Sequence, residues 1–332
     1  SQAGVTVDLY DGMPSVGRKF LLAGVGGMNI THSEAYPAFL SRYAEANWMH
    51  KRMLGLSARL AALPAPEPEL TAALYRAQAN DAYWHGLFGG LYLPHLRRAV
   101  WRNLLELEAG LDALQPRAPL SEADLDLDGR TEALAGTAEL QLALRDDGLG
   151  ALHELSSYPL RHNFADALRR YAEAYHAQIG TQSSTAPAGG IASAHDILRS
   201  KQPIDAADLR PDALPRLLCL DAIDGQPLAD YRRTPGSLEL LRAGVTKRYI
   251  VEGATLRVVW HLRGLAGRRF STTLNLAMPS CDGFLGRYRL ADGGIPGGFG
   301  QALAFDGTRL RLEDGVLGGA LAIAASAPAS VR

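Results

Sequence analysis

The densest group of polar and aromatic residues lies between positions 78 and 86, in the sequence QANDAYWHG. On a helix, Asp81 would share a face with Trp84, three residues on, and with His85, four residues on. A carboxylate beside an indole suits a sugar, whose ring stacks on the aromatic face while Asp81, Asn80 and His85 bond to its hydroxyls. The alternative is a helix end whose aromatic side chains fill the core and whose aspartate caps a turn. Spacing alone favours this second interpretation.

Other potential catalytic groups carry weaker signals. The histidines show no HxH or HExxH ligand spacing, so they are expected to be structural and no metal site is predicted. No GxSxG elbow is present to anchor a serine triad. Glu106 and Glu108 lie two apart on an expected helix and point to different sides, which makes them a poor acid/base pair. The sequence therefore nominates no catalytic residue.

Composition excludes several classes of protein. The chain has 332 residues, of which 47% are apolar and 21% charged, with a formal net charge of −1. These values are typical of a globular protein and give no overall field that would hold nucleic acid or an anionic membrane. No apolar run is long enough for a membrane-spanning helix. The two cysteines form no CxxC pair, so a reducing, cytoplasmic setting is expected.

Residues 35–113 have apolar side chains at helical spacing. Three prolines at 64, 66 and 68 end a first helix, a second is expected from about Glu69 towards Tyr83, and a third from about His95 to Ala113. After residue 120, Asp-Gly pairs and alternating runs over 138–144 and 254–260 predict antiparallel strands.

One further helix is expected over 163–177, and no closing strand is evident at the C-terminus. The predicted fold class is α+β and multidomain, with a helical bundle followed by an antiparallel β-sandwich. The expected domains are a short fragment over 1–40, the helical bundle over 41–118 and the β-sandwich over 119–332, truncated at its end.

Two strings in the helical region resemble glycoside hydrolase family 57. They are SRYAEANWMHKRMLGLSARL, like the family's entry into its helical domain, and AQANDAYWHGLFGGLYLPHLRRAVWRNLLELEA, like its fifth motif. Weaker counterparts are Gly150–Phe164, AHDILRSK, KRYIVEGATLRVVWHL and FSTTLNLAMPS. Together they cover about residues 41–316 and resemble the middle and C-terminal parts of the 4-α-glucanotransferase and α-amylase branch.

That resemblance implies an α-1,4-glucan or maltooligosaccharide partner and a retaining mechanism. The Glu nucleophile and Asp acid/base belong to an N-terminal (β/α) barrel, which is absent here, so no catalytic residue is carried over. The fifth motif implies that Asp81 and Trp84, with Asn80 and His85, contact the glucan. Loss of the barrel would also expose an apolar face at Tyr83, Trp84, Leu87 and Phe88, which favours self-association.

Residues 1–43 instead resemble the start of an NAD(P)/FAD-dependent flavoprotein family, so that the chain resembles a chimera. The resemblance implies FAD contacts for Asp11, Gly17, Arg18, Lys19, Gly24 and Asn29. The fragment lacks the GxGxxG turn, so no cofactor is expected unless it were complete. Two alternatives to a glucan-active enzyme portion therefore remain, an FAD-dependent oxidoreductase fragment and a non-catalytic carbohydrate-binding module.

Overall fold

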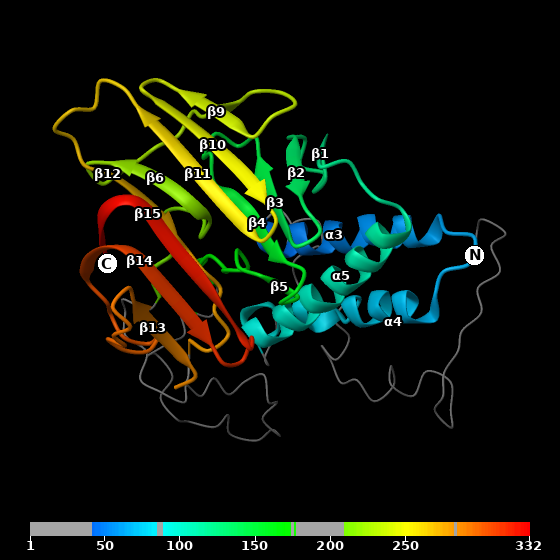
Figure 1. Ribbon diagram of the computed structural model, residues 1–332. Helices are drawn as coiled ribbons and strands as arrows, with labels where there is room; N and C mark the ends of the chain where they lie inside the picture. The colour runs from blue at the N-terminus through cyan, green and yellow to red at the C-terminus, as the bar shows by residue number, and fades with distance from the viewer. Residues whose placement is uncertain (1–41, 85–88, 174–175, 177–208, 282–283) are drawn as a thin grey trace, which may run out of the picture. The chain divides into compact units, whose positions relative to one another are not determined.

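The computed structural model describes residues 42–84, 89–173, 176, 209–281 and 284–332. The chain divides into two compact units, Ser1–Ala44 and Glu45–Arg332. Nearly all of the first unit lies outside the described residues, so the following account concerns the second unit (Figure 1).

The predicted helices are confirmed as α3 (Ala44–Ala61), α4 (Pro68–Ala77) and α5 (Pro94–Leu114). Both α4 and α5 begin with a proline, whose fixed φ and missing N–H suit a first helical turn. The helix expected to reach Tyr83 ends at Ala77 instead, and two single 3₁₀ turns follow, η2 (Asn80–Ala82) and η3 (Gly90–Tyr92). Among the described residues, no helix has both the length and the apolar character needed to cross a bilayer.

The described strands form three antiparallel sheets. The first has the order β1-β2-β3-β4-β6-β12, with β5 on β4 and β7 on β6; the second has the order β11-β10-β9-β8, and the third β13-β14-β15. The first sheet contains β1 (Leu120–Ala123), β2 (Glu132–Gly136), β3 (Leu140–Arg145), β4 (Leu152–Ser157), β5 (His162–Asn163), β6 (Leu218–Ile223), β7 (Gln226–Pro227) and β12 (Phe270–Leu274). The others contain β8 (Arg232–Arg233), β9 (Glu239–Arg242), β10 (Val245–Glu252), β11 (Thr255–Leu262), β13 (Gly286–Leu290), β14 (Phe305–Asp314) and β15 (Gly319–Val331).

Strands β2 and β3 are buried on both faces. Because successive side chains in a strand point to opposite faces, Leu142 and Leu144 enter the core between the sheets, while Ala143 packs with the helices. Leu134 of β2 also joins the helical core. The first sheet is thus the middle layer, with helices on one face and sandwich core on the other (Figure 1).

A β-bulge in β4 determines which of its side chains faces the helices. The pairing of β3 with β4 shifts between Ala143, which lies opposite Glu154, and Leu144, which lies opposite Leu152. The extra residue allows Leu152 and Leu155 both to join the sandwich core, although an odd number of positions separates them. Glu154 is left on the helical face, where it is fully buried.

Arg52 of α3 links the carboxylate of Glu154 in β4 to the carboxylate of Glu108 in α5. Its Nη2 lies 2.6 Å from Glu108 and its Nε lies 3.1 Å from Glu154, and both carboxylates are fully buried. The Gln141 amide of β3 donates to both carboxylates, at 3.0 and 2.9 Å. Although burial alone would raise the pKa of Glu108, Arg52 and Arg117 hold it below its usual range. Residues from two helices and two strands therefore form one buried network of charges and hydrogen bonds.

A second buried ion pair joins the first two sheets. Lys247 of β10 and Asp221 of β6 are 2.9 Å apart (Nζ to Oδ2), and both side chains are fully buried. The ammonium lies 5.1–5.8 Å from the ring centroids of Tyr231, Tyr249 and Trp260. Burial lowers the pKa of Lys247, and Asp221 opposes this effect. The pair is enclosed, so its role is to tie the two sheets together.

Two expectations from the sequence are wrong. No helix runs from residue 163 through the described residues to 173, because the Asn163 side chain accepts the N–H groups of Leu155 and Ala165 and forms a turn. At the other end of the chain, Gly319–Val331 is a long strand, β15, that pairs with β14. Its alanine and serine residues lack the alternation of large apolar side chains that identifies a strand in sequence.

We predict that Arg52→Ala strongly destabilises the fold. The substitution leaves Glu108 and Glu154 buried without their shared cation, which typically costs about 3–5 kcal/mol. Urea unfolding at pH 7 measures the change. The control is Arg257→Ala, since Arg257 and its partner Glu252 are mostly exposed and a surface pair contributes about 1 kcal/mol or less. Equal effects of the two substitutions would contradict the prediction.

A second prediction concerns acid stability. Burial lowers the pKa of His162 to about 4, and its Nε2 donates to the carbonyl oxygen of Ala277 at 2.7 Å. Because the folded pKa lies below the unfolded value of about 6.5, the stability is complete above pH 6.5 and falls as the pH drops towards 4. Between pH 7 and pH 5 this group alone removes about 2 kcal/mol.

The measurement is urea unfolding of three proteins at pH 7 and pH 5. His162→Gln should lose less stability on acidification than the wild type, whereas His95→Gln, at an exposed position, should match the wild type. An unchanged pH dependence in His162→Gln would show that the ring does not titrate as described.

Candidate functional site

The polar and aromatic segment singled out in the sequence connects α4 to α5. Helix α4 ends as the Gln78 N–H donates to the carbonyl oxygens of Leu74 and Tyr75, at 3.0 and 3.3 Å. The backbone then tightens into the η2 turn, closed by the Tyr83 N–H donating to Asn80 at 2.9 Å. The prediction of one helix through this segment is therefore wrong, and Asp81 and Trp84 do not share an α-helical face.

Tyr83 belongs to the core of the helical region. Its side chain is 6% exposed, its hydroxyl donates to the carbonyl oxygen of Ala77 at 2.7 Å, and its ring meets His50 edge-on. The expectation that Tyr83 would be part of an exposed apolar face is thus wrong, because the η2 turn folds it inward. Leu87 and Phe88, expected on the same face, lie outside the described residues.

Trp84 differs from Tyr83 in its exposure and in its hydrogen bonding. Its side chain is half-buried, and its buried indole N–H has no hydrogen-bond partner among the described residues. The side chains of Asn80 and Asp81 are exposed and bond to no described residue. An exposed amide and an exposed carboxylate thus precede a half-buried aromatic ring by four and three positions, while His85 lies outside the described residues.

The backbone beyond this segment is held in place by a glycine and an arginine. Gly89 has a φ of +98°, and a Cβ there would lie 2.9 Å from Cγ of Leu93. The Leu91 N–H returns to the carbonyl oxygen of Trp84 at 2.7 Å. Arg97 of α5 is buried; it donates to the Leu91 carbonyl oxygen and pairs with Asp166 at 3.1 Å. The turn that presents Trp84 is therefore anchored to the β-region.

Other titratable residues serve structural contacts. His153 pairs with Asp147 at 2.9 Å, in agreement with the structural role expected for the histidines. Glu106 is a surface partner of Arg161, whereas Glu108 lies in the buried network, so the two do point to different sides.

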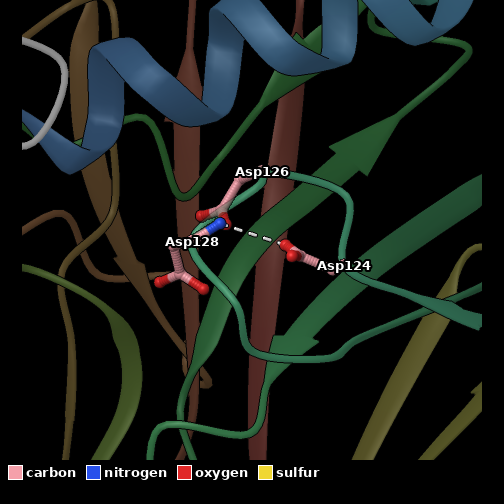
Figure 2. Close-up of side chains that lie close together, drawn as sticks. All are labelled: Asp124, Asp126 and Asp128. Atoms are coloured by element: carbon pink, nitrogen blue, oxygen red, sulfur yellow. Dashed lines mark hydrogen bonds between the residues drawn. The ribbon is translucent and has the colours of Figure 1, made fainter. Parts of the chain in front are cut away.

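Sequence reasoning missed a cluster of three carboxylates between β1 and β2. Ligand-type oxygens of Asp124, Asp126 and Asp128 all lie within 4.8 Å of one another (Figure 2). The sequence carries a signal for it, D-x-D-x-D-G over 124–129, which histidine and cysteine spacings do not detect. The residues proposed to contact FAD, from Asp11 to Asn29, lie outside the described residues.

We predict that Gly89→Ala destabilises the protein by about 1–3 kcal/mol, because an L-residue is strained at this φ and Leu93 has to move. The matched control is Gly55→Ala in α3, where no atom lies within 4 Å of the new methyl group. That substitution should stabilise by up to about 1 kcal/mol through helix propensity. Urea midpoints compare the two, and a midpoint for Gly89→Ala at or above the wild-type value would refute the prediction.

Two family models match the chain. Residues 34–111 match the middle domain of alpha-amylase/4-alpha-glucanotransferase, and residues 124–229 and 231–332 match its C-terminal domain. These matches give no support to the flavoprotein resemblance of residues 1–43.

Curated relatives agree with this assignment. The chain is 34% identical over 220 residues to an alpha-amylase from Pyrococcus furiosus, covering 62% of this chain and 32% of that protein. It is 44% identical over 138 residues to an alpha-amylase from Pyrococcus horikoshii, covering 42% and 20%. It is 38% identical over 159 residues to a 4-alpha-glucanotransferase from Thermococcus kodakarensis, covering 48% and 23%. The chain thus spans about a third or less of these relatives.

A solved structure shares the fold. The crystal structure of 4-alpha-glucanotransferase from Thermococcus litoralis matches with a TM-score of 0.64 and 23% identity, covering 89% of this chain and 44% of that one. Because the C-terminal family model alone covers more than half of the chain, the assignment does not depend on the fold. The chain belongs to the alpha-amylase/4-alpha-glucanotransferase family, glycoside hydrolase family 57, of which it carries the middle and C-terminal domains.

Proposed function

We propose that this chain is the helical and C-terminal β-portion of a glucan-active enzyme and that it binds α-1,4-glucan without cleaving it. The observation that carries the proposal is the half-buried indole of Trp84, which lies close in sequence to the exposed carboxylate of Asp81 and the exposed amide of Asn80. Family membership supports the substrate class, since relatives are named alpha-amylase and 4-alpha-glucanotransferase.

The chemistry of the segment suits a sugar hydroxyl. A hydroxyl group both donates and accepts, so the hydroxyls of one glucose unit can donate to the exposed carboxylate of Asp81 and accept from the exposed amide of Asn80. The apolar ring of the indole covers the C–H face of the sugar. The buried position of Tyr83 and the return hydrogen bond from Leu91 to Trp84 fix the backbone on which these groups sit. Such preorganisation reduces the entropy lost on binding.

Cleavage would need two carboxyl groups, one on each side of the glycosidic bond. The fully buried pair Glu108 and Glu154 cannot serve, because Arg52 occupies the space between them and no sugar reaches them. We therefore assign glucan binding to this chain. Neither Glu108 nor Glu154 is assigned as the nucleophile or the acid/base.

The test is affinity electrophoresis of the 332-residue chain through gels containing amylose. We expect retardation of the wild type and a dissociation constant at least about tenfold weaker for Trp84→Ala, since a stacked aromatic anchor contributes about 2 kcal/mol or more. Asp81→Asn should weaken binding by a smaller factor, because the amide keeps one acceptor but loses the charge.

The control is Tyr75→Ala, which removes an aromatic ring that is 67% exposed on the neighbouring helix α4. It should migrate like the wild type. Circular dichroism confirms that each variant is folded. Equal mobility of wild type and Trp84→Ala in amylose, with both folded, would refute the proposed site.

A further inference from the structure

The loop between β1 and β2 concentrates negative charge. It contains three aspartates at alternate positions, Asp124, Asp126 and Asp128, followed directly by Gly129. The loop turns sharply, with positive φ angles at Leu127 and Gly129. As a result, oxygens from all three carboxylates lie within 4.8 Å of one another (Figure 2).

Hydrogen bonds from backbone N–H groups hold the loop in this shape, and because these donors are neutral they do not cancel the negative charge of the carboxylates. The Asp124 carboxylate accepts the N–H groups of Asp128 and Gly129, at 3.1 and 3.0 Å. At the other end, Glu132 accepts the N–H groups of Leu125 and Asp126, at 2.7 and 3.3 Å. The carboxylates are therefore prearranged before any ligand arrives.

Asp126 supplies an independent indication of a missing partner. Its side chain is 1% exposed, and its Oδ1 atom is buried with no hydrogen-bond partner among the described residues. Figure 2 shows its carboxylate directed towards the part of the loop that carries Asp124 and Asp128. Arg145 pairs with the other oxygen, Oδ2, and leaves Oδ1 open. A buried carboxylate oxygen without a partner is costly, and a cation would satisfy it.

The charges around the loop do not balance. Four carboxylates, those of Asp124, Asp126, Asp128 and Glu132, face a single described cationic partner, Arg145, which lies 3.3 Å from Glu132 and 3.9 Å from Asp128. Three of these carboxylates, those of Asp124, Asp126 and Asp128, belong to the proposed cluster, so the single guanidinium leaves a surplus of negative charge at the loop.

We propose that the loop over 124–132 is a calcium site in which Asp124, Asp126 and Asp128 bind the ion through their carboxylates. All the donors are hard oxygens, which suit Ca²⁺ and not the softer transition metals. Aspartates at positions 1, 3 and 5 with glycine at position 6 reproduce the first half of an EF-hand loop. Ala135 stands where that loop has its bidentate glutamate, so affinity is modest, with a dissociation constant of about 10⁻⁵ to 10⁻³ M.

Binding at this loop would stabilise the junction between helices and sheet. The backbone oxygen of Asp126 accepts from the Asn47 side chain of α3 at 2.8 Å, and its carboxylate pairs with Arg145 of β3. The ion would thus fix a loop that contacts both the helices and the first sheet. Calcium is expected to act as a structural ion here, separate from the glucan site around Trp84.

The experiment uses the 332-residue chain, stripped with EGTA and dialysed into metal-free buffer. Calorimetric titration with CaCl₂ should show one saturable site, and thermal unfolding in 5 mM CaCl₂ should shift the midpoint upwards by several degrees. Asp128→Asn, an exposed and isosteric change, should weaken binding at least tenfold and abolish the shift. Asp292→Asn is the control, because Asp292 is also an exposed loop aspartate that accepts a backbone N–H and precedes a glycine.

Three outcomes would overturn the proposal. They are no binding heat and no thermal shift in the wild type, an equal calcium response in Asp128→Asn, or an equal thermal shift in MgCl₂. The first excludes a site, the second places it elsewhere, and the third reduces it to general screening by divalent ions. Far-ultraviolet circular dichroism of Asp128→Asn confirms that the loop variant is folded, and Asp124→Asn repeats the test at a second ligand.

Discussion

The described structure depends on one guanidinium shared between layers. Arg52 projects from α3 between the buried carboxylates of α5 and β4, and Gln141 of β3 bonds to the same two groups. A buried charge is tolerated only when it is paired and hydrogen-bonded, so each member of this group requires the others. The turn that carries Trp84 lies between α4 and α5, and its position follows from how these helices sit on the sheet.

The helical and strand regions could be predicted because their signals are local. The prolines at 68 and 94 mark the starts of α4 and α5, and the alternating runs mark β3 and β11. The turn at Asn80–Ala82 could not be predicted, because a 3₁₀ turn and the end of an α-helix share the same residue types. The side-chain turn at Asn163 was missed for a similar reason, since the segment after it has helical composition.

The candidate site was predictable only in part. The residue types of Asn80, Asp81 and Trp84 suggested sugar binding, and the family resemblance gave the segment its weight. The sequence could not show that Tyr83 is buried while Trp84 stays half-exposed, because both are aromatic neighbours in one motif. The acidic loop was equally visible in the sequence, yet its meaning came from the burial of Asp126, which depends on tertiary packing.

The bulge in β4 has a consequence for how such domains evolve. By placing Glu154 on the helical face, it makes a β-region residue part of the same charge group as residues from two helices. The helical and β-regions therefore cannot be exchanged independently between relatives. A recombinant with an apolar residue at position 154 would leave Arg52 paired with Glu108 but without its second carboxylate partner. Residues 52, 108, 141 and 154 are expected to covary as a set, and a crossover that keeps both regions functional must carry all four from one parent.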